Sequence, residues 1–376
     1  LSPVSFAWAA GSDHVVSVDN TASFPGVAET RHHFQQWSDG GARGHAITAS
    51  GTSTKYTASY RARHQLTLVT TPLKGGTVDV SPSSGDGFYD EGAAIALTAA
   101  PATGYKFARW SGGLSGAENP KVLTVARPHS VTAGFGIPGE ITSGNVLSAA
   151  TLLRSPAVPG GLFTILGVDV GPDQEAQLEL GSDGKVSTKL AGTRVLFDGV
   201  PAPLVYVSRN QINAVTPFSV AGKILSMIVV ETPGRQILPA GVPVDDTRPG
   251  IFTLNASGSG QGAILNEDAT INSPSNPAAR GSIIVLYATG AGQTDPAGSD
   301  GKLNTFPLPK PLLPVQVRIG GRLAEVHYAG AAPQLVAGVL QVNAKVPADI
   351  LPGDDVPLVL MVGKTASPAS VTLSIR

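Results

Sequence analysis

Seven histidines are the residues of this chain most able to act as a catalytic base or a metal ligand, but their spacing favours neither role. The adjacent His32 and His33 would point to opposite faces of a strand, so their rings cannot form one site locally. The sequence has neither a His-Glu-x-x-His pattern nor a Gly-x-Ser-x-Gly elbow, and zero Cys excludes thiolate catalysis and cysteine-based metal sites. We therefore expect no enzyme activity, no catalytic residues and no cofactor. The histidines are His14, His32, His33, His45, His64, His129 and His327.

Acidic residues offer one sharper alternative, a calcium site formed by Asp86, Asp90 and Glu91. Their spacing does not fit an EF-hand loop, which needs a dense set of oxygen ligands around a fixed Gly. Acidic residues beside Gly or Pro commonly accept backbone hydrogen bonds at turns and stay solvated. We expect that turn role and no metal site, with calcium at these three carboxylates as the alternative.

Two identical pentapeptides, Gly-Ser-Asp-Gly-Lys at 181–185 and 298–302, could resemble phosphate-binding loops. A phosphate cradle needs a strand, loop and helix around it, whereas Asp-Gly is a hairpin signal. The pattern therefore predicts two turns and no anion site.

Three tryptophans, Trp8, Trp37 and Trp110, are the candidates for an aromatic surface that either packs in the fold or faces a ligand. Trp37 and Trp110 occupy the same place in two copies of a Phe-x-x-Trp-Ser motif that leads into Gly-Gly. A recurrent Trp at one position of a small module favours a core role over sugar stacking. Trp8 is less constrained by its neighbours and could be exposed.

Four amides also recur, as Gln211 and Asn213 in one place and Gln341 and Asn343 in another. Each pair flanks an apolar residue on an alternating segment, and buried amides need partners. We expect them to hold neighbouring loops and not to form a binding site.

The composition describes a turn-rich β-protein with small cores. Hydrophobic residues make 42% of the 376 residues, and 45 Gly and 30 Pro lie between alternating apolar runs. Only 14% of residues are charged, the net charge is −1, and no basic block provides an electrostatic footprint for nucleic acid. No apolar run approaches the roughly 20 residues of a membrane-spanning helix. The chain begins at Leu1, which suggests a processed product, and its composition favours export.

Alternation of apolar and polar residues predicts strands wherever a pattern exists, for example at 64–69, 94–98, 315–319 and 371–375. The best helical candidate is short, from Asn145 to Leu153 with Ser143 as its cap. The fold class is therefore all-β.

Two duplications divide the chain. Both Trp motifs lead into a Thr-Ala strand that an aromatic residue closes, but only the second copy has the opening strands. In the C-terminal part, Gly161 to Leu166 matches Gly281 to Leu286, and the Gln-x-Asn-Ala strands recur 130 residues apart. We predict a partial Trp-type repeat at 1–62, a complete one at 63–137, a first immunoglobulin-like sandwich at 138–255, and a connecting segment with a second sandwich at 256–376.

These motifs resemble known bacterial families. The units around Trp37 and Trp110 resemble the divergent internalin-B-type repeat of exported surface proteins. The region from Asn145 onward resembles the C-terminal domain of secreted proteins from Solibacter-like Acidobacteria, and each of its halves is loosely similar to an immunoglobulin-like TIG module. The resemblance implies β-modules outside the cell and supplies no activity. The segments that carry the second resemblance are 202–208, 211–213, 249–252, 287–290 and 341–343.

These features predict a non-enzymatic structural or adhesion protein, secreted or on the cell surface. The first alternative is a filament subunit, because missing strands in the first repeat would expose a sheet edge that another chain can pair with. The second alternative is a carbohydrate-binding module. Expected partners are other copies of the chain, joined head to tail, or components of the cell surface and extracellular matrix, and neither nucleic acid nor a membrane span is expected.

Overall fold

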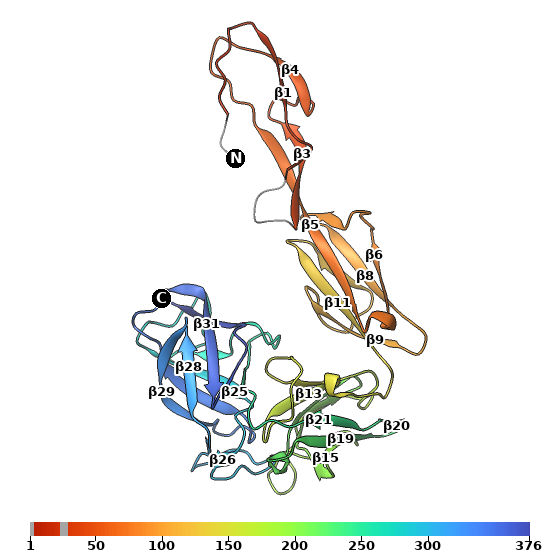
Figure 1. The fold of residues 1–376 in the computed structure, drawn as a ribbon, viewed down its shortest axis with the longest axis vertical. Helices are drawn as coiled ribbons and strands as arrows, with labels where there is room; N and C mark the ends of the chain where they lie inside the picture. Colours follow the sequence, from red (N-terminus) through yellow and green to blue (C-terminus); the bar gives the residue numbers. More distant parts are fainter. Residues whose placement is uncertain (1–3, 23–28) are drawn as a thin grey trace. The chain divides into compact units, whose positions relative to one another are not determined.

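The computed structural model describes residues 4–22 and 29–376, which fold into two compact units, 1–136 and 137–376 (Figure 1). Strands and their connections make up the described residues, with three short 3-10 turns and no α-helix among them. The all-β fold class is confirmed. No helix of the described part is long and apolar enough to cross a membrane.

The complete Trp repeat is a two-layer sandwich in the first unit (Figure 1). One layer contains β5, β11 and β9, with β5 and β11 parallel, and the other contains β10, β8 and β6. Their facing side chains surround the fully buried Trp110, Ile95 and Leu97. The strands of this unit are β1 (Asp13–Ser17), β2 (Thr21–Ala22), β3 (Thr30–Trp37), β4 (Gly44–Thr48), β5 (Ala58–Thr71), β6 (Gly76–Ser81), β7 (Phe88–Asp90), β8 (Ala94–Pro101), β9 (Lys106–Gly112), β10 (Lys121–Thr124) and β11 (His129–Gly136), with a 3-10 turn at Leu73–Gly75.

The first sandwich of the second unit packs two antiparallel sheets around one core. Asp198 and Gly199 make the turn between β15 and β16 with positive φ angles of 48° and 85°, as the Asp-Gly signal predicts. The strands are β12 (Val146–Ser148), β13 (Leu162–Leu166), β14 (Ala176–Gln177), β15 (Arg194–Phe197), β16 (Val200–Pro201), β17 (Leu204–Ser208), β18 (Gln211–Val215), β19 (Leu225–Thr232), β20 (Arg235–Gln236) and β21 (Ala240–Pro243), with 3-10 turns at Ser143–Asn145 and Phe218–Val220.

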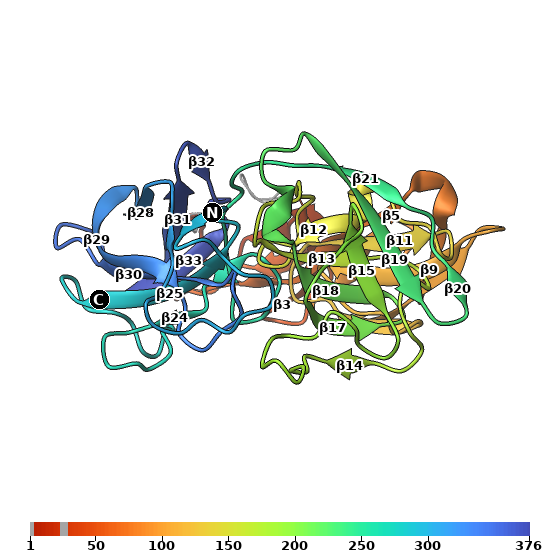
Figure 2. The same cartoon turned by 90° about the horizontal axis from the view of Figure 1, so that it is seen from below.

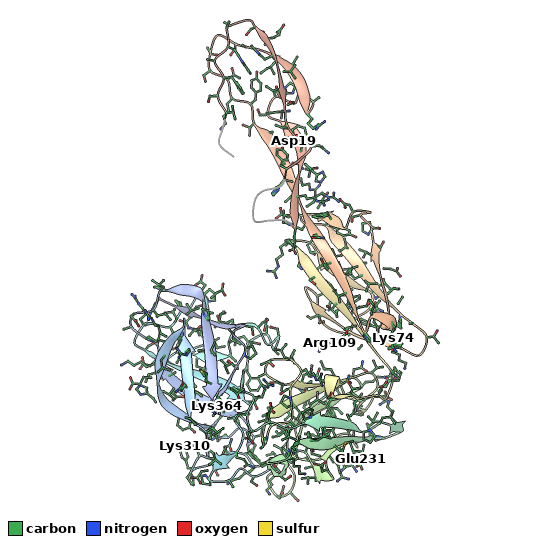
Figure 3. The ribbon with its side chains drawn as sticks, viewed as in Figure 1. Asp19, Lys74, Arg109, Glu231, Lys310 and Lys364 are labelled. Carbon is green, nitrogen blue, oxygen red and sulfur yellow. The ribbon has the colours of Figure 1, made fainter. Side chains whose placement is uncertain are left out.

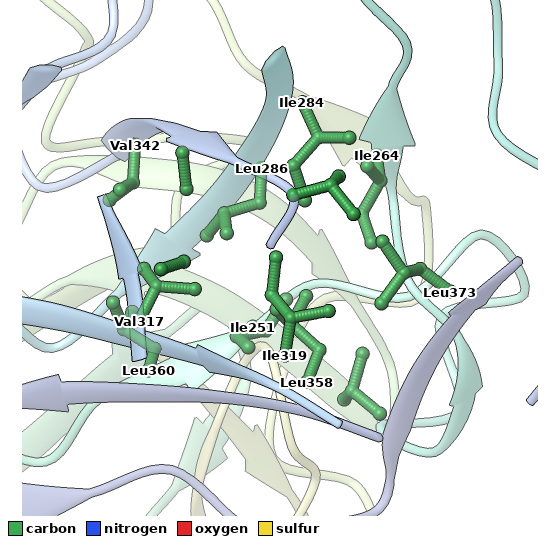
Figure 4. Packing of buried hydrophobic residues seen from close by; sticks show 14 of the residues in the cluster. Ile251, Ile264, Ile284, Leu286, Val317, Ile319, Val342, Leu358, Leu360 and Leu373 are labelled. Atoms are coloured by element: carbon green, nitrogen blue, oxygen red, sulfur yellow. The ribbon is translucent and has the colours of Figure 1, made fainter. Parts of the chain in front are cut away.

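The second sandwich is made from a ten-stranded sheet whose two halves face each other (Figure 4). Ile284 and Leu286 of β25 and Val342 of β30 lie in the same core as Leu358 and Leu360 of β31. The strands are β22 (Gly250–Ile251), β23 (Gly260–Gln261), β24 (Ile264–Leu265), β25 (Ile283–Thr289), β26 (Thr294–Asp295), β27 (Lys310–Pro311), β28 (Val315–Ile319), β29 (Arg322–Ala331), β30 (Leu340–Lys345), β31 (Gly353–Val362), β32 (Thr365–Ala366) and β33 (Val371–Ile375).

Two predictions from the sequence are wrong, one of a helix and one of the alignment between the sandwiches. The helix expected from Asn145 to Leu153 is wrong, because Val146 to Ser148 form β12, which pairs with β13. The repeat between the sandwiches is shifted by one residue from the sequence match. Thr164 pairs with Asn213 as Val285 pairs with Asn343, so Thr164 is equivalent to Val285 and not to Ile284. A shift of one residue exchanges the two faces of a strand, and burial in both cores selects the structural register.

Contacts between the two sandwiches join them within the second unit (Figure 2). The backbone N–H of Phe218 donates to Asp300 Oδ1 at 2.9 Å, and Gln293 Nε2 donates to the Phe218 carbonyl at 3.0 Å. The two identical pentapeptides meet here, because the Val186 N–H, just after the first, donates to the Gly301 carbonyl in the second at 2.8 Å. Both pentapeptides form turns, as predicted.

Gly338 gives a test of this junction. It has a φ of 115°, and a Cβ there would overlap the carbonyl oxygen of Gly160 in the first sandwich. We expect Gly338→Ala to lower the free energy of unfolding of the second unit by about 2 to 4 kcal/mol, from backbone strain and overlap together. Gly199→Ala is the control, because Gly199 has a φ of 85° and open space around its Cβ position, so only about 1 kcal/mol of strain is expected. Equal losses in urea denaturation would show that the overlap plays no part.

Candidate functional site

The two Trp repeats pair their equivalent strands in the same register. Trp37 of β3 pairs with Ala58 of β5, and Trp110 of β9 pairs with Ala133 of β11. The indole N–H of each Trp donates to a backbone carbonyl in the following loop, at 3.0 Å in the first repeat and 2.8 Å in the second. The strands that the two repeats have in common are therefore arranged in the same way.

An aromatic cluster recurs with the same partners. Phe34 and Tyr60 meet edge to face at 6.1 Å between ring centroids, as Phe107 and Phe135 do at 6.0 Å. Tyr60 adds a hydroxyl that donates to the carbonyl of Asp19 at 3.1 Å, a residue labelled in Figure 3. In both clusters the rings pack edge to face, an arrangement typical of aromatic side chains in a hydrophobic core.

Among the described residues, the first repeat shows no counterpart of two strands that the second repeat contains. In the second repeat, β11 pairs with the C-terminal half of β5, and β8 pairs with β6. The equivalent strands of the first repeat are the N-terminal half of β5 and β1. Within residues 4–22 and 29–376, β1 pairs with β4 alone, and residues 54–57 belong to no strand. We call these two vacant places, beside residues 54–59 and beside β1, the open strand positions.

Two side chains of the first repeat are less buried than their equivalents in the core of the second repeat. His14 and Val16 on β1 are equivalent by register to Ile95 and Leu97 on β8. The two β8 side chains are fully buried, whereas the two on β1 are only half-buried. The clusters of buried apolar residues in the described structure include the second repeat and both sandwiches, and no member comes from residues 4–22 or 29–62.

Trp8 also lies at a position whose equivalent in the second repeat is buried. The Gly11 N–H donates to Ala49 as Gly92 N–H donates to Val125, which makes Trp8 equivalent to the buried Tyr89. The Trp8 ring stacks on His14 at 3.9 Å and on Phe6 at 5.2 Å, yet Trp8 keeps 37% of its surface exposed. In comparison, Trp37 is 8% exposed and Trp110 is 0% exposed. Gly11 and Gly92 are the sequence feature from which the equivalence of Trp8 and Tyr89 could have been predicted.

A charged cluster marks the junction between the two repeats and takes up two of the three carboxylates considered for calcium. Arg63 donates to both oxygens of Asp86, at 2.9 and 3.0 Å, and its Nε lies 3.5 Å from Asp90. Arg61 lies 3.1 Å from Asp90, and Arg31 packs over the Phe88 ring. Hydrogen bonds from Arg63 hold the pKa of Asp86 below its usual value. These carboxylates serve as partners of arginine in the described structure.

The histidines belong to no group of three or more His, Cys, Asp or Glu side chains that could hold a metal ion among the described residues. His64 Nδ1 shares a hydrogen bond of 3.1 Å with Thr30 Oγ1, and the Nε2 atoms of His64 and His129 are buried without a hydrogen-bond partner. Burial, with a smaller effect of the Arg127 and His64 charges, lowers the pKa of His129.

The lowered pKa of His129 predicts acid sensitivity of the first unit. The unfolded chain takes up a proton at this residue near pH 6.5, before the folded chain does, so stability is complete above that pH and falls as the pH drops towards the folded pKa. We expect His129→Gln to reduce the loss of stability between about pH 8 and about pH 5 in urea denaturation. His327→Gln, at an exposed histidine of the second unit, is the control. A pH dependence of the first unit that is unchanged by His129→Gln would contradict this assignment.

The recurrent amides bond each other and not the loops that we expected. Gln211 Nε2 donates to Asn213 Oδ1 at 2.9 Å, and Gln341 Nε2 donates to Asn343 Oδ1 at 2.9 Å. Gln211 and Asn213 line a shallow hollow of about 590 Å³ beside Tyr206. Each bond joins two residues on the same face of a single strand, β18 in the first sandwich and β30 in the second.

Comparisons with known proteins bear mainly on the complete Trp repeat. The model of the divergent InlB B-repeat domain matches residues 66–137, and no curated protein matches the chain. Among solved structures, the plexin A4 extracellular region is 10% identical with a TM-score of 0.20 over 83% of this chain, which spans 33% of the plexin chain. The I9–I11 tandem of titin is 10% identical with a TM-score of 0.17, over 83% of this chain and 97% of the titin fragment. Neither likeness carries an argument. The complete Trp repeat is therefore similar to the divergent InlB B-repeat domain, as its motif predicted.

Proposed function

We propose that this chain is a non-enzymatic structural or adhesion protein that is secreted by a bacterium or held on its surface. One observation carries the proposal: β5 runs through 14 residues as the last strand of the first repeat and the first strand of the second. Repeats that follow one another in this way contact only their neighbours and build an extended surface. The match of residues 66–137 to the divergent InlB B-repeat supports a location outside the cell.

The second unit supports the same role. We propose that it is a Solibacter-type C-terminal domain of two TIG-like sandwiches, on the strength of its recurrent Gln-x-Asn strands and its joined modules. Its polar contacts hold turns and strands together, as Asp198 does by accepting from Lys223, Ser226 and the Met227 N–H. These bonds, first the one from Lys223, lower the Asp198 pKa to about 2.

Labelling of native cells tests the proposal. Gold-tagged antibody against the full chain should mark the cell surface or the medium, and beads coated with the chain should adhere to cells or matrix more than uncoated beads do. Label confined to the cytoplasm would contradict it.

A second candidate function is self-assembly by strand complementation, which the open strand positions favour. Strand β33 is already paired on both sides, with β31 and with β23, so this strand is not free to act as the donor. Negative-stain microscopy of native material tests this candidate, and monomers at every concentration and salt would contradict it. Sugar stacking at the three tryptophans is not part of the proposal, because each ring occupies a core position.

A further inference from the structure

We infer that the outer face of the first sandwich binds a neutral carbohydrate through Gln211, Asn213 and Tyr206. The inference rests on the proposed adhesion role and names the chemical class of its ligand. It starts from the recurrent amides, whose place in the fold the core does not explain. Ile212 and Ala214 are buried, whereas Gln211 and Asn213 on the same strand are half-buried on the opposite face.

Strand pairing aligns the residues of this face. Tyr206 of β17 is paired with Asn213 of β18 and with Gln177 of β14, and directly paired residues point to the same side of a sheet. Gln211 lies two residues before Asn213, so its side chain is on that side as well. They surround a hollow of about 590 Å³, within the range of about 300 to 1,000 Å³ that is usual for small-ligand sites. The hollow is lined by Gln177, Leu178, Val205, Tyr206, Gln211 and Asn213.

The amide pair keeps one donor group and one acceptor available to a ligand. Gln211 Nε2 donates to Asn213 Oδ1 at 2.9 Å. Within the residues that the structure describes, Gln211 Oε1 and Asn213 Nδ2 have no hydrogen-bond partner, and neither atom is buried. A hydroxyl group both donates and accepts, so neighbouring hydroxyl groups of a sugar can bond to both atoms. The bonded amides therefore form a fixed pair of contacts for a ligand that is rich in hydroxyl groups.

Tyr206 adds an aromatic ring to the same hollow. Its hydroxyl donates to Glu175 Oε2 at 2.9 Å, beside β14 and on the side away from β18. This bond holds the ring at the wall of the hollow, next to the amides. A sugar ring has a face of C–H groups that packs on an aromatic ring while its hydroxyl groups bond to polar side chains. A ring beside free amides is suited to both faces of such a ligand.

The lining residues carry no charge at neutral pH, which favours a neutral ligand. Arg209, close to Gln211 in the chain, is paired with Asp169 at 2.5 Å and lies 3.7 Å from Asp173. An extended peptide is a less suitable occupant. Because β18 is paired with both β13 and β17, its backbone offers no edge for main-chain hydrogen bonds. Recognition at this face must therefore use side chains.

The second sandwich carries the same residue types in a different arrangement. Tyr328 is paired with Asn343, and Gln341 Nε2 donates to Asn343 Oδ1 as in the first sandwich. The Tyr328 hydroxyl donates to the Ala331 carbonyl at 2.8 Å, and a Cβ on Gly330 would lie 2.6 Å from that hydroxyl. Tyr328 is therefore packed onto its own sheet over Gly330, the strand partner of Gln341. The amides of the second sandwich provide a matched control.

Affinity electrophoresis of the full chain tests the inference. The gels contain hydroxyethyl cellulose, galactomannan or dextran as neutral polysaccharides, alginate as a charged one, or gelatin as a protein. We expect a neutral polysaccharide to retard the chain, and Gln211→Ala with Asn213→Ala to weaken binding about 10-fold or more. Tyr206→Ala, which leaves the amides in place, should show a similar loss. Gln341→Ala with Asn343→Ala should bind as the unmodified chain does, and urea denaturation checks that every variant is folded.

The inference is overturned if no neutral polysaccharide retards the chain, if only alginate or gelatin does, or if the two double variants lose binding equally. Cell labelling reports on the proposed role separately. A surface-bound chain that binds no neutral polysaccharide overturns only the carbohydrate site. A cytoplasmic chain that binds one through Asn213 overturns only the proposed role.

Discussion

Trp110→Ala is expected to unfold the complete repeat and leave the second unit folded. The Trp110 side chain is fully buried at the centre of the core formed by both sheets, and its ring lies 4.9 Å from that of Phe107. Truncation of a buried Trp costs about 3 to 5 kcal/mol, which is a large part of the stability of a small domain. Urea denaturation should show loss of the transition of the first unit, with the second unit unchanged.

Trp37→Ala is the matched control in the same motif. Trp37 keeps 8% of its surface exposed, and no cluster of buried apolar residues surrounds it in the described first repeat. We therefore expect a loss of about 1 to 2 kcal/mol, confined to the first repeat. A larger loss from Trp37→Ala than from Trp110→Ala would contradict the view that only the second repeat has a complete core.

Adding the two strands ahead of residue 7 is expected to stabilise the first repeat of residues 1–376. Phe88 is equivalent to Ala7, so a second copy of residues 61–87 joined directly ahead of Ala7 supplies both missing strands. Four added apolar side chains bury the half-exposed core, and after the cost of ordering the segment we expect at least about 2 kcal/mol of added stability in the first repeat. Urea denaturation and acrylamide quenching of Trp8 would measure it.

The same insertion with Leu66→Asp and Leu68→Asp in the added copy is the control. It keeps the length and the turns but cannot bury the two side chains that should face the core. If both chimaeras match residues 1–376 in free energy of unfolding and in Trp8 quenching, filling the open strand positions does not stabilise the first repeat.

The period of two in the sequence was enough to predict the all-β fold, because one buried face per strand is a local pattern. The recurrent Phe and Trp correctly placed Trp110 in the core of the second repeat, and the same motif gives Trp37 the equivalent strand partner in the first. The helix predicted from Asn145 to Leu153 is wrong because the pairing of β12 with β13, a contact between distant residues, overrides a weak helical pattern.

Other features needed register and long-range contacts. The sequence match between the sandwiches was one residue out, because several apolar residues in a row fit either face of a strand. The identical pentapeptides meet only because the two sandwiches pack on each other. Trp8 looked unconstrained because its position becomes clear only when Gly11 and Gly92 are aligned through their hydrogen bonds.

Native amide exchange on the unmodified full chain tests the central claim most directly, that the first repeat is the second repeat with two strands missing. Equivalent strands can be compared within one molecule: β1 with β8, and residues 54–61 with β11. We expect β8 and β11 to exchange only on unfolding of the second repeat, and β1 and residues 54–61 to exchange through local opening at much lower free energy. Equal protection of the equivalent strands would contradict the account.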